Sequence, residues 1–135
     1  MKIERMHHVA YRCKDAKQTV DWYTKHLNMN FVLAIAEDQV PSTHAPDPYM
    51  HLFMDAGGGN ILAFFEIPNS PPMGRDTNTP DWVQHIAFKV DSVATLEAMI
   101  CGLAPGRLAC TVIVGKSICG RGATGGLAVV VAATG

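Results

Sequence analysis

The sequence predicts an α+β protein built from two copies of one structural unit. Three observations lead to this prediction: an alternating strand is followed by a helix and three further strands, a proline-rich connector interrupts the chain, and the opening pattern then returns. With 135 residues and 48% hydrophobic content, the chain is long enough to bury a two-layer core.

The first unit opens with the segment from Met6 to Cys13, which alternates in the manner of a half-buried strand. His8 therefore shares a face with Ala10 and Arg12. Asp15 stands where a helix N-cap is expected, and apolar residues then recur at helical spacing. The remaining expected elements are a helix at 16–27, strands at 31–36, 49–54 and 61–67, and a loop at 37–48.

Residues 68–80 contain four prolines, which is the composition of a connector. The hexapeptide from His85 then repeats the hexapeptide from His8 in kind, HIAFKV against HVAYRC, 77 residues later. A helix is expected after it, capped by Asp91 or Ser92. We therefore expect one domain over 1–135, with module one at 5–67, a linker at 68–80 and module two at 81–135.

The repeated histidines suggest a metal site. Two equivalent strands related by a pseudo-twofold axis would bring His8 and His85 onto facing surfaces, and imidazole is a common ligand for zinc, nickel and iron. A lone strand histidine is more often a hydrogen-bonded core or rim residue, but its recurrence at equivalent positions favours a ligand pair. A carboxylate would complete such a site.

Composition and charge exclude several other functions. The net charge of -1 gives no attraction to nucleic acid or to an anionic membrane, so a small molecule is the expected partner. The N-terminal residues lack the apolar run of a signal peptide, which predicts a cytoplasmic protein. The four cysteines lack the spacing of a zinc site or a disulfide framework.

Four segments carry a family resemblance: HHVAYRCKD, DWYTKHLNM, GGGNILAFFEIP and QHIAFKVDS. Together they resemble the vicinal-oxygen-chelate superfamily, which contains glyoxalases, bleomycin-resistance proteins and extradiol dioxygenases. The resemblance implies an α+β fold of paired βαβββ modules forming a curved, mostly antiparallel sheet, and a homodimer. It implies metal ligation by His8 and His85, with a carboxylate near the end of the second module.

The resemblance also indicates which branch of the superfamily to expect. Glyoxalase-like members carry a further ligand at the position of Ala63, and alanine cannot bind a metal. Glu66 lies three positions further along the strand, on the opposite face, where an exposed or structural role is expected. The pattern therefore resembles metal-dependent extradiol dioxygenases acting on a small oxygen-rich aromatic substrate, with iron(II) or manganese(II) favoured over zinc or nickel. His51 is the candidate catalytic residue.

Two alternatives remain open at this stage. One keeps the metal site in a glyoxalase-like lyase or an antibiotic-modifying transferase. The other is a metal-free, drug-binding protein that resembles the bleomycin-resistance members. His51 is also interpretable as a surface histidine, as are His7, His26 and His44.

The composition changes from about residue 98. All 12 acidic residues lie at or before Glu97, and the tail after it is rich in glycine. Two strands are expected there, at 110–114 and 127–133, and the position equivalent to Ala63 would be 140. Our hypothesis is a frameshifted or replaced tail without the family's terminal glutamate, which would leave the second module incomplete and catalysis impaired. The alternative is a divergent but genuine C-terminal half.

Overall fold

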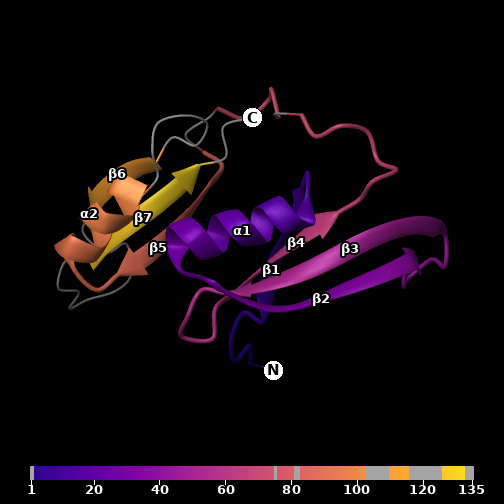
Figure 1. Ribbon diagram of the computed structural model, residues 1–135, viewed down its shortest axis with the longest axis horizontal. Coiled ribbons are helices and arrows are strands. Elements are labelled where there is room, and N and C mark those ends of the chain that lie inside the picture. The colour runs from indigo at the N-terminus through magenta and orange to yellow at the C-terminus, as the bar shows by residue number, and fades with distance from the viewer. Residues whose placement is uncertain (1, 75, 81–82, 103–109, 116–125, 133–135) are drawn as a thin grey trace. The chain divides into compact units, whose positions relative to one another are not determined.

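The computed structural model describes residues 2–74, 76–80, 83–102, 110–115 and 126–132. It divides between Met73 and Gly74 into two compact units, each described here by itself. The elements, labelled in Figure 1, are β1 (His8–Cys13), α1 (Ala16–Leu27), β2 (Asn30–Gln39), β3 (Pro46–Asp55), β4 (Ile61–Glu66), β5 (His85–Val90), α2 (Val93–Gly102), β6 (Cys110–Gly115) and β7 (Gly126–Ala132).

The first unit is one βαβββ module. Its four strands lie in the order β1-β4-β3-β2, with β1 parallel to β4 and the other neighbours antiparallel. Helix α1 connects one edge strand, β1, to the other, β2, and the two following hairpins return the chain to the side of β1. The predicted α+β class and the mostly antiparallel sheet are confirmed.

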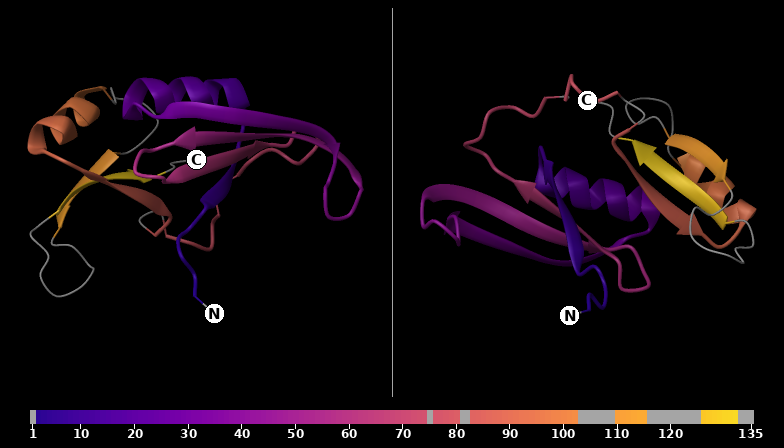
Figure 2. Two further views of the ribbon diagram at one scale, coloured as in Figure 1. Left: turned by 90° about the horizontal axis from the view of Figure 1, so that it is seen from below. Right: turned by 180° about the vertical axis from the view of Figure 1, so that it is seen from behind.

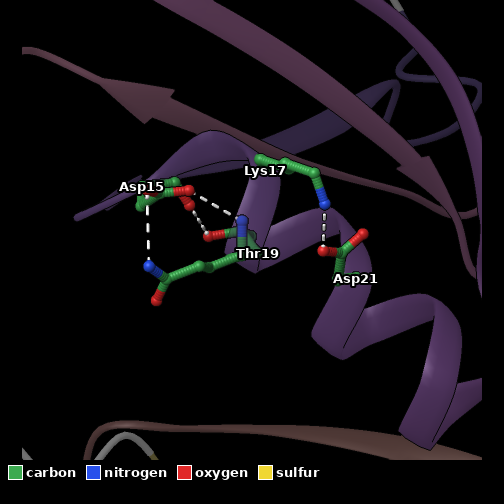
Figure 3. Close-up of polar contacts among 5 residues, drawn as sticks. Asp15, Lys17, Thr19 and Asp21 are labelled. Carbon is green, nitrogen blue, oxygen red and sulfur yellow. Dashed lines mark hydrogen bonds and ion pairs between the residues drawn. The ribbon is translucent and has the colours of Figure 1, made fainter.

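Helix α1 begins at the predicted cap. The Asp15 carboxylate accepts a hydrogen bond from the Gln18 backbone N–H at 2.7 Å, and the Thr19 hydroxyl donates to the Asp15 carbonyl (Figure 3). The first of these bonds satisfies an N–H that the first helical turn would otherwise leave unpaired. The helix ends at Asn28, whose left-handed φ of 53° is typical of a C-cap.

The core of this unit lies between α1 and one face of its sheet. Leu52, Met54, Leu62 and Phe64 are almost completely buried on β3 and β4. The Tyr23 ring of α1 packs on the Phe64 ring with centroids 4.9 Å apart, and the views of Figure 2 show α1 lying across this face. Burial raises the pKa of Tyr23 to about 12. Because α1 covers this face of the sheet, only the opposite face is available to a ligand.

The predicted loop at 37–48 is wrong in its extent. Strand β2 continues to Gln39, β3 already begins at Pro46, and these two residues pair across the hairpin. Val40 donates to the Ala45 carbonyl at 2.9 Å and closes the turn. Proline is tolerated at the first residue of a strand, where its missing N–H need not join the ladder.

The second unit repeats the opening of the first with fewer described strands. Strand β5 is followed by α2, whose cap is Ser92: its hydroxyl accepts from the Thr95 N–H at 3.1 Å. The described strands lie in the order β5-β7-β6, all antiparallel. The two strands predicted in the tail are present, although Ala133 lies outside the described residues. Among those residues, neither helix is long and apolar enough to cross a membrane.

The core predicts the effect of Leu52→Ala. Leu52 is 1% exposed, so its truncation leaves a cavity and should lower the free energy of unfolding by about 2 to 5 kcal/mol. Urea denaturation followed by circular dichroism measures this change. Leu33→Ala, at a side chain that is 42% exposed, is the matched control and should cost far less. Equal losses in the two variants would contradict the described packing.

Candidate functional site

The sheet face turned away from the α1 core carries a cluster of histidine and phenylalanine rings. His8 opens β1, whereas His51 and Phe53 lie on β3 and Phe65 on β4. Cross-strand pairing places these side chains on one face, because paired residues project to the same side of a sheet. We call the face defined by these four residues the histidine face.

His51 lies at the centre of this cluster. Its ring stacks on Phe65 with centroids 3.7 Å apart and an interplanar angle of 16°, and it contacts Phe53 at 4.2 Å. The Nε2 atom is buried and forms no hydrogen bond within the described part of the chain. Burial lowers the pKa of His51, and the neighbouring His8 ring lowers it further. The imidazole is therefore held in a fixed orientation with one ring nitrogen unsatisfied.

His8 stands beside this ring in an exposed position. Its centroid is 5.9 Å from that of His51 and 5.4 Å from that of Phe53. Its Nδ1 atom lies 2.8 Å from the Nδ1 of His7, so one of the two rings donates a hydrogen bond to the other. A His8 ring that donates this bond keeps the lone pair on its Nε2 atom for a metal ion. The structure thus brings together two of the three predicted site residues.

Ala63 occupies the position where glyoxalase-like proteins carry a ligand. It is fully buried on β4 and pairs with Ala10 on one side and Phe53 on the other. The side chains of Ala10 and Ala63 are only methyl groups, so the Phe53 ring can lie above them and contact the His8 ring edge-to-face. This position supplies no metal ligand, as the sequence predicts.

Glu66 has the structural role expected of it. Its side chain lies on the opposite face, where Oε2 accepts a hydrogen bond of 2.6 Å from the Ala16 backbone N–H at the start of α1. This bond satisfies a helix N–H and ties α1 to the end of β4. The Glu66 carboxylate therefore stabilises the start of α1.

His85 opens β5 in the second unit. Its strand alternates as predicted, with His85, Ala87 and Lys89 exposed and the residues between them half-buried. His85 occupies the same place in its unit as His8 does in the first, at the start of a strand that leads into a capped helix. Within the described residues, no group of three or more His, Cys, Asp or Glu side chains is arranged to hold a metal ion.

Residues 5–124 match the family model of the Glyoxalase/Bleomycin resistance protein/Dioxygenase superfamily. The chain belongs to this superfamily. The match extends beyond Glu97 into the region of changed composition. Members of the superfamily commonly bind a divalent metal and act on small molecules.

Among the curated relatives, the chain is 33% identical over 99 residues to the protein named as the ring-cleaving dioxygenase MhqA of Bacillus subtilis (strain 168). The alignment covers 71% of the chain and 28% of that relative, so the chain spans less than a third of the relative's length. No solved structure matches the chain.

The sequence predicted the histidines of this face as site residues but not their aromatic neighbours. Phe53 and Phe65 hold His51, and both lie on its face by strand alternation and pairing. The two-residue period of a strand already places Phe53 on the same face as His51. Placing Phe65 there requires the register of β3 against β4, which the sequence does not reveal. The other histidines lie elsewhere: His26 packs against Trp22 on α1, and His44 lies in the β2–β3 turn.

The role of Glu66 leads to a prediction that separates structure from ligation. Glu66→Ala should lower the free energy of unfolding by about 1 to 2 kcal/mol, because the Ala16 N–H loses its acceptor. Metal content, measured by elemental analysis, should not change. The control is Glu37→Ala on β2, which removes an exposed carboxylate and should affect neither quantity. Loss of metal with unchanged stability would show that Glu66 is a ligand.

Proposed function

We propose that the chain is a metal-dependent, extradiol-dioxygenase-like enzyme that acts on a small oxygen-rich aromatic substrate. The observation that carries this proposal is the fixed His51 ring beside His8 on the histidine face. Superfamily membership and the ring-cleaving relative support the same reaction class. In that reaction, both atoms of dioxygen enter the product and one ring C–C bond beside a hydroxyl-bearing carbon breaks.

We assign His8 and His85 as metal ligands, with iron(II) or manganese(II) favoured and zinc or nickel as the alternatives. Both imidazoles are exposed and open the first strand of their units, so the donor set is suited to a divalent ion. When bound, such an ion supplies a site for two substrate oxygens and for dioxygen.

A carboxylate ligand is not supplied by the sequence after Glu97, which contains no acidic residue. Two neutral imidazoles neutralise a divalent ion poorly and leave more coordination positions to water or substrate. We therefore expect weak metal binding and dependence of activity on added metal. This expectation distinguishes the chain from superfamily members with a complete ligand set.

His51 is the proposed catalytic residue for proton transfer. Stacking on Phe65 fixes its plane, and its buried Nε2 forms no hydrogen bond among the described residues. A substrate hydroxyl held near His8 would lie within reach of this ring, given the 5.9 Å between the two imidazoles. His51 would accept a hydroxyl proton and later return a proton to the product.

The experiment compares His51→Gln with wild type after anaerobic loading with iron(II). We expect wild type to consume dioxygen with catechol and to form a coloured ring-opened product. The variant should lose about 10²- to 10⁴-fold in kcat, because proton transfer loses its acceptor, while its metal content stays unchanged. An oxygen electrode and absorbance measure the reaction.

His44→Gln is the matched control, because His44 lies in the exposed β2–β3 turn. This control should retain wild-type kcat. Unchanged kcat in His51→Gln would remove His51 from the mechanism. Absence of oxygen consumption by metal-loaded wild type with any catechol would contradict the proposed reaction and favour a drug-binding protein.

A further inference from the structure

Strand β2 is an exposed apolar edge of the first sheet. All its residues from Asn30 to Gln39 are exposed, and those from Phe31 to Ala36 are all apolar. In the views of Figures 1 and 2, the β2–β3 hairpin extends past the end of α1. Exposed apolar strands of this length commonly mark a binding surface.

A β-bulge decides which of these side chains reach the histidine face. The register shifts between Phe31 and Leu33, so Val32 is the additional residue. Beyond the bulge, Leu33 pairs with Phe53 and Ile35 pairs with His51. Without this shift, the same residues would project to the α1 side.

Leu33 and Ile35 therefore extend the histidine face outward as an apolar shelf. Each is 42% exposed, and each stands one strand away from a ring of the cluster. The two imidazoles are 5.9 Å apart, and cross-strand neighbours stand about 5 Å apart. A ring-sized molecule bound beside His8 and His51 would therefore reach Ile35 with a substituent.

The charges around the shelf disfavour an anionic substituent. Glu37 follows Ile35 on the same face and pairs with Tyr49. Arg12 lies in the row of Ile35 but three strands away, about 14 Å at the usual strand spacing. Its Nη2 donates to the Pro71 carbonyl at 2.7 Å. A carboxylate on the shelf would thus meet an acidic neighbour rather than a basic one.

Resting on the proposed function, we propose that the substrate is an aromatic diol carrying an uncharged alkyl or aryl substituent, which packs on Leu33 and Ile35. The diol end lies at His8 and His51, and the substituent covers the exposed side chains of β2. Leu33 and Ile35 then determine specificity, because their contribution depends on the substituent and not on the reacting oxygens.

The test compares 4-tert-butylcatechol, catechol and 3,4-dihydroxybenzoate with the full-length chain loaded with iron(II). Dissociation constants measured anaerobically by calorimetry report binding without turnover. Wild type should bind 4-tert-butylcatechol about tenfold more tightly than catechol, since a few methyl groups on apolar surface contribute this much. It should bind 3,4-dihydroxybenzoate most weakly.

The double variant Leu33→Thr, Ile35→Thr should lose most of the preference for 4-tert-butylcatechol and keep its affinity for catechol. Threonine is β-branched, which suits a strand, but it presents a hydroxyl. Val32→Thr, at the bulge and 49% exposed, is the matched control and should behave as wild type. Circular dichroism of all three proteins verifies that the fold is retained.

Three results would overturn the proposal: tighter binding of the carboxylate, no preference in wild type, or an unchanged preference in the double variant. If that variant also dissociates a dimer in sedimentation, the shelf is an interface between two copies of the chain. Failure of the proposed function would give a different result: wild type would prefer 4-tert-butylcatechol in binding but would consume no dioxygen.

Discussion

The backbone pairing of β4 between β1 and β3 is the constraint on which the first unit depends. Its parallel register with β1 and antiparallel register with β3 put His8 and His51 on one face and the Leu62 and Phe64 side chains in the core. A shift of β4 by one residue would turn Phe65 toward the core and turn Leu62 and Phe64 away from it. Glu66 at the end of β4 also caps α1, so the same strand fixes the helix.

Much of the first module followed from the sequence, because its signals are local. Alternation identified the strands, Asp15 marked the start of α1, and the repeated hexapeptide identified His85 as the counterpart of His8. The ends of β2 and β3 were not predictable in this way, since prolines in a hairpin resemble a loop. The bulge at Val32 was also missed: nothing in an apolar run indicates which residue is additional.

The second module shows the limit of the repeat. Its opening strand and helix follow the first copy, but β5 pairs antiparallel with β7, whereas β1 pairs parallel with β4. The second unit has one strand fewer among the described residues, and the strand next to its opening strand β5 is antiparallel to it. The two modules are therefore of unequal content among the described residues, and the sequence of the second one has no acidic residue after Glu97.

The central proposal is that His8 and His85 are metal ligands. Metal binding by untagged protein, measured by equilibrium dialysis against saturating iron(II) or manganese(II), tests it most directly in wild type, His8→Ala, His85→Ala and the control His44→Ala. Wild type and His44→Ala should bind about one ion per chain, and each of the other variants should lose it. Retention of the ion by either single variant, or no binding by wild type, would contradict the assignment of both histidines as ligands.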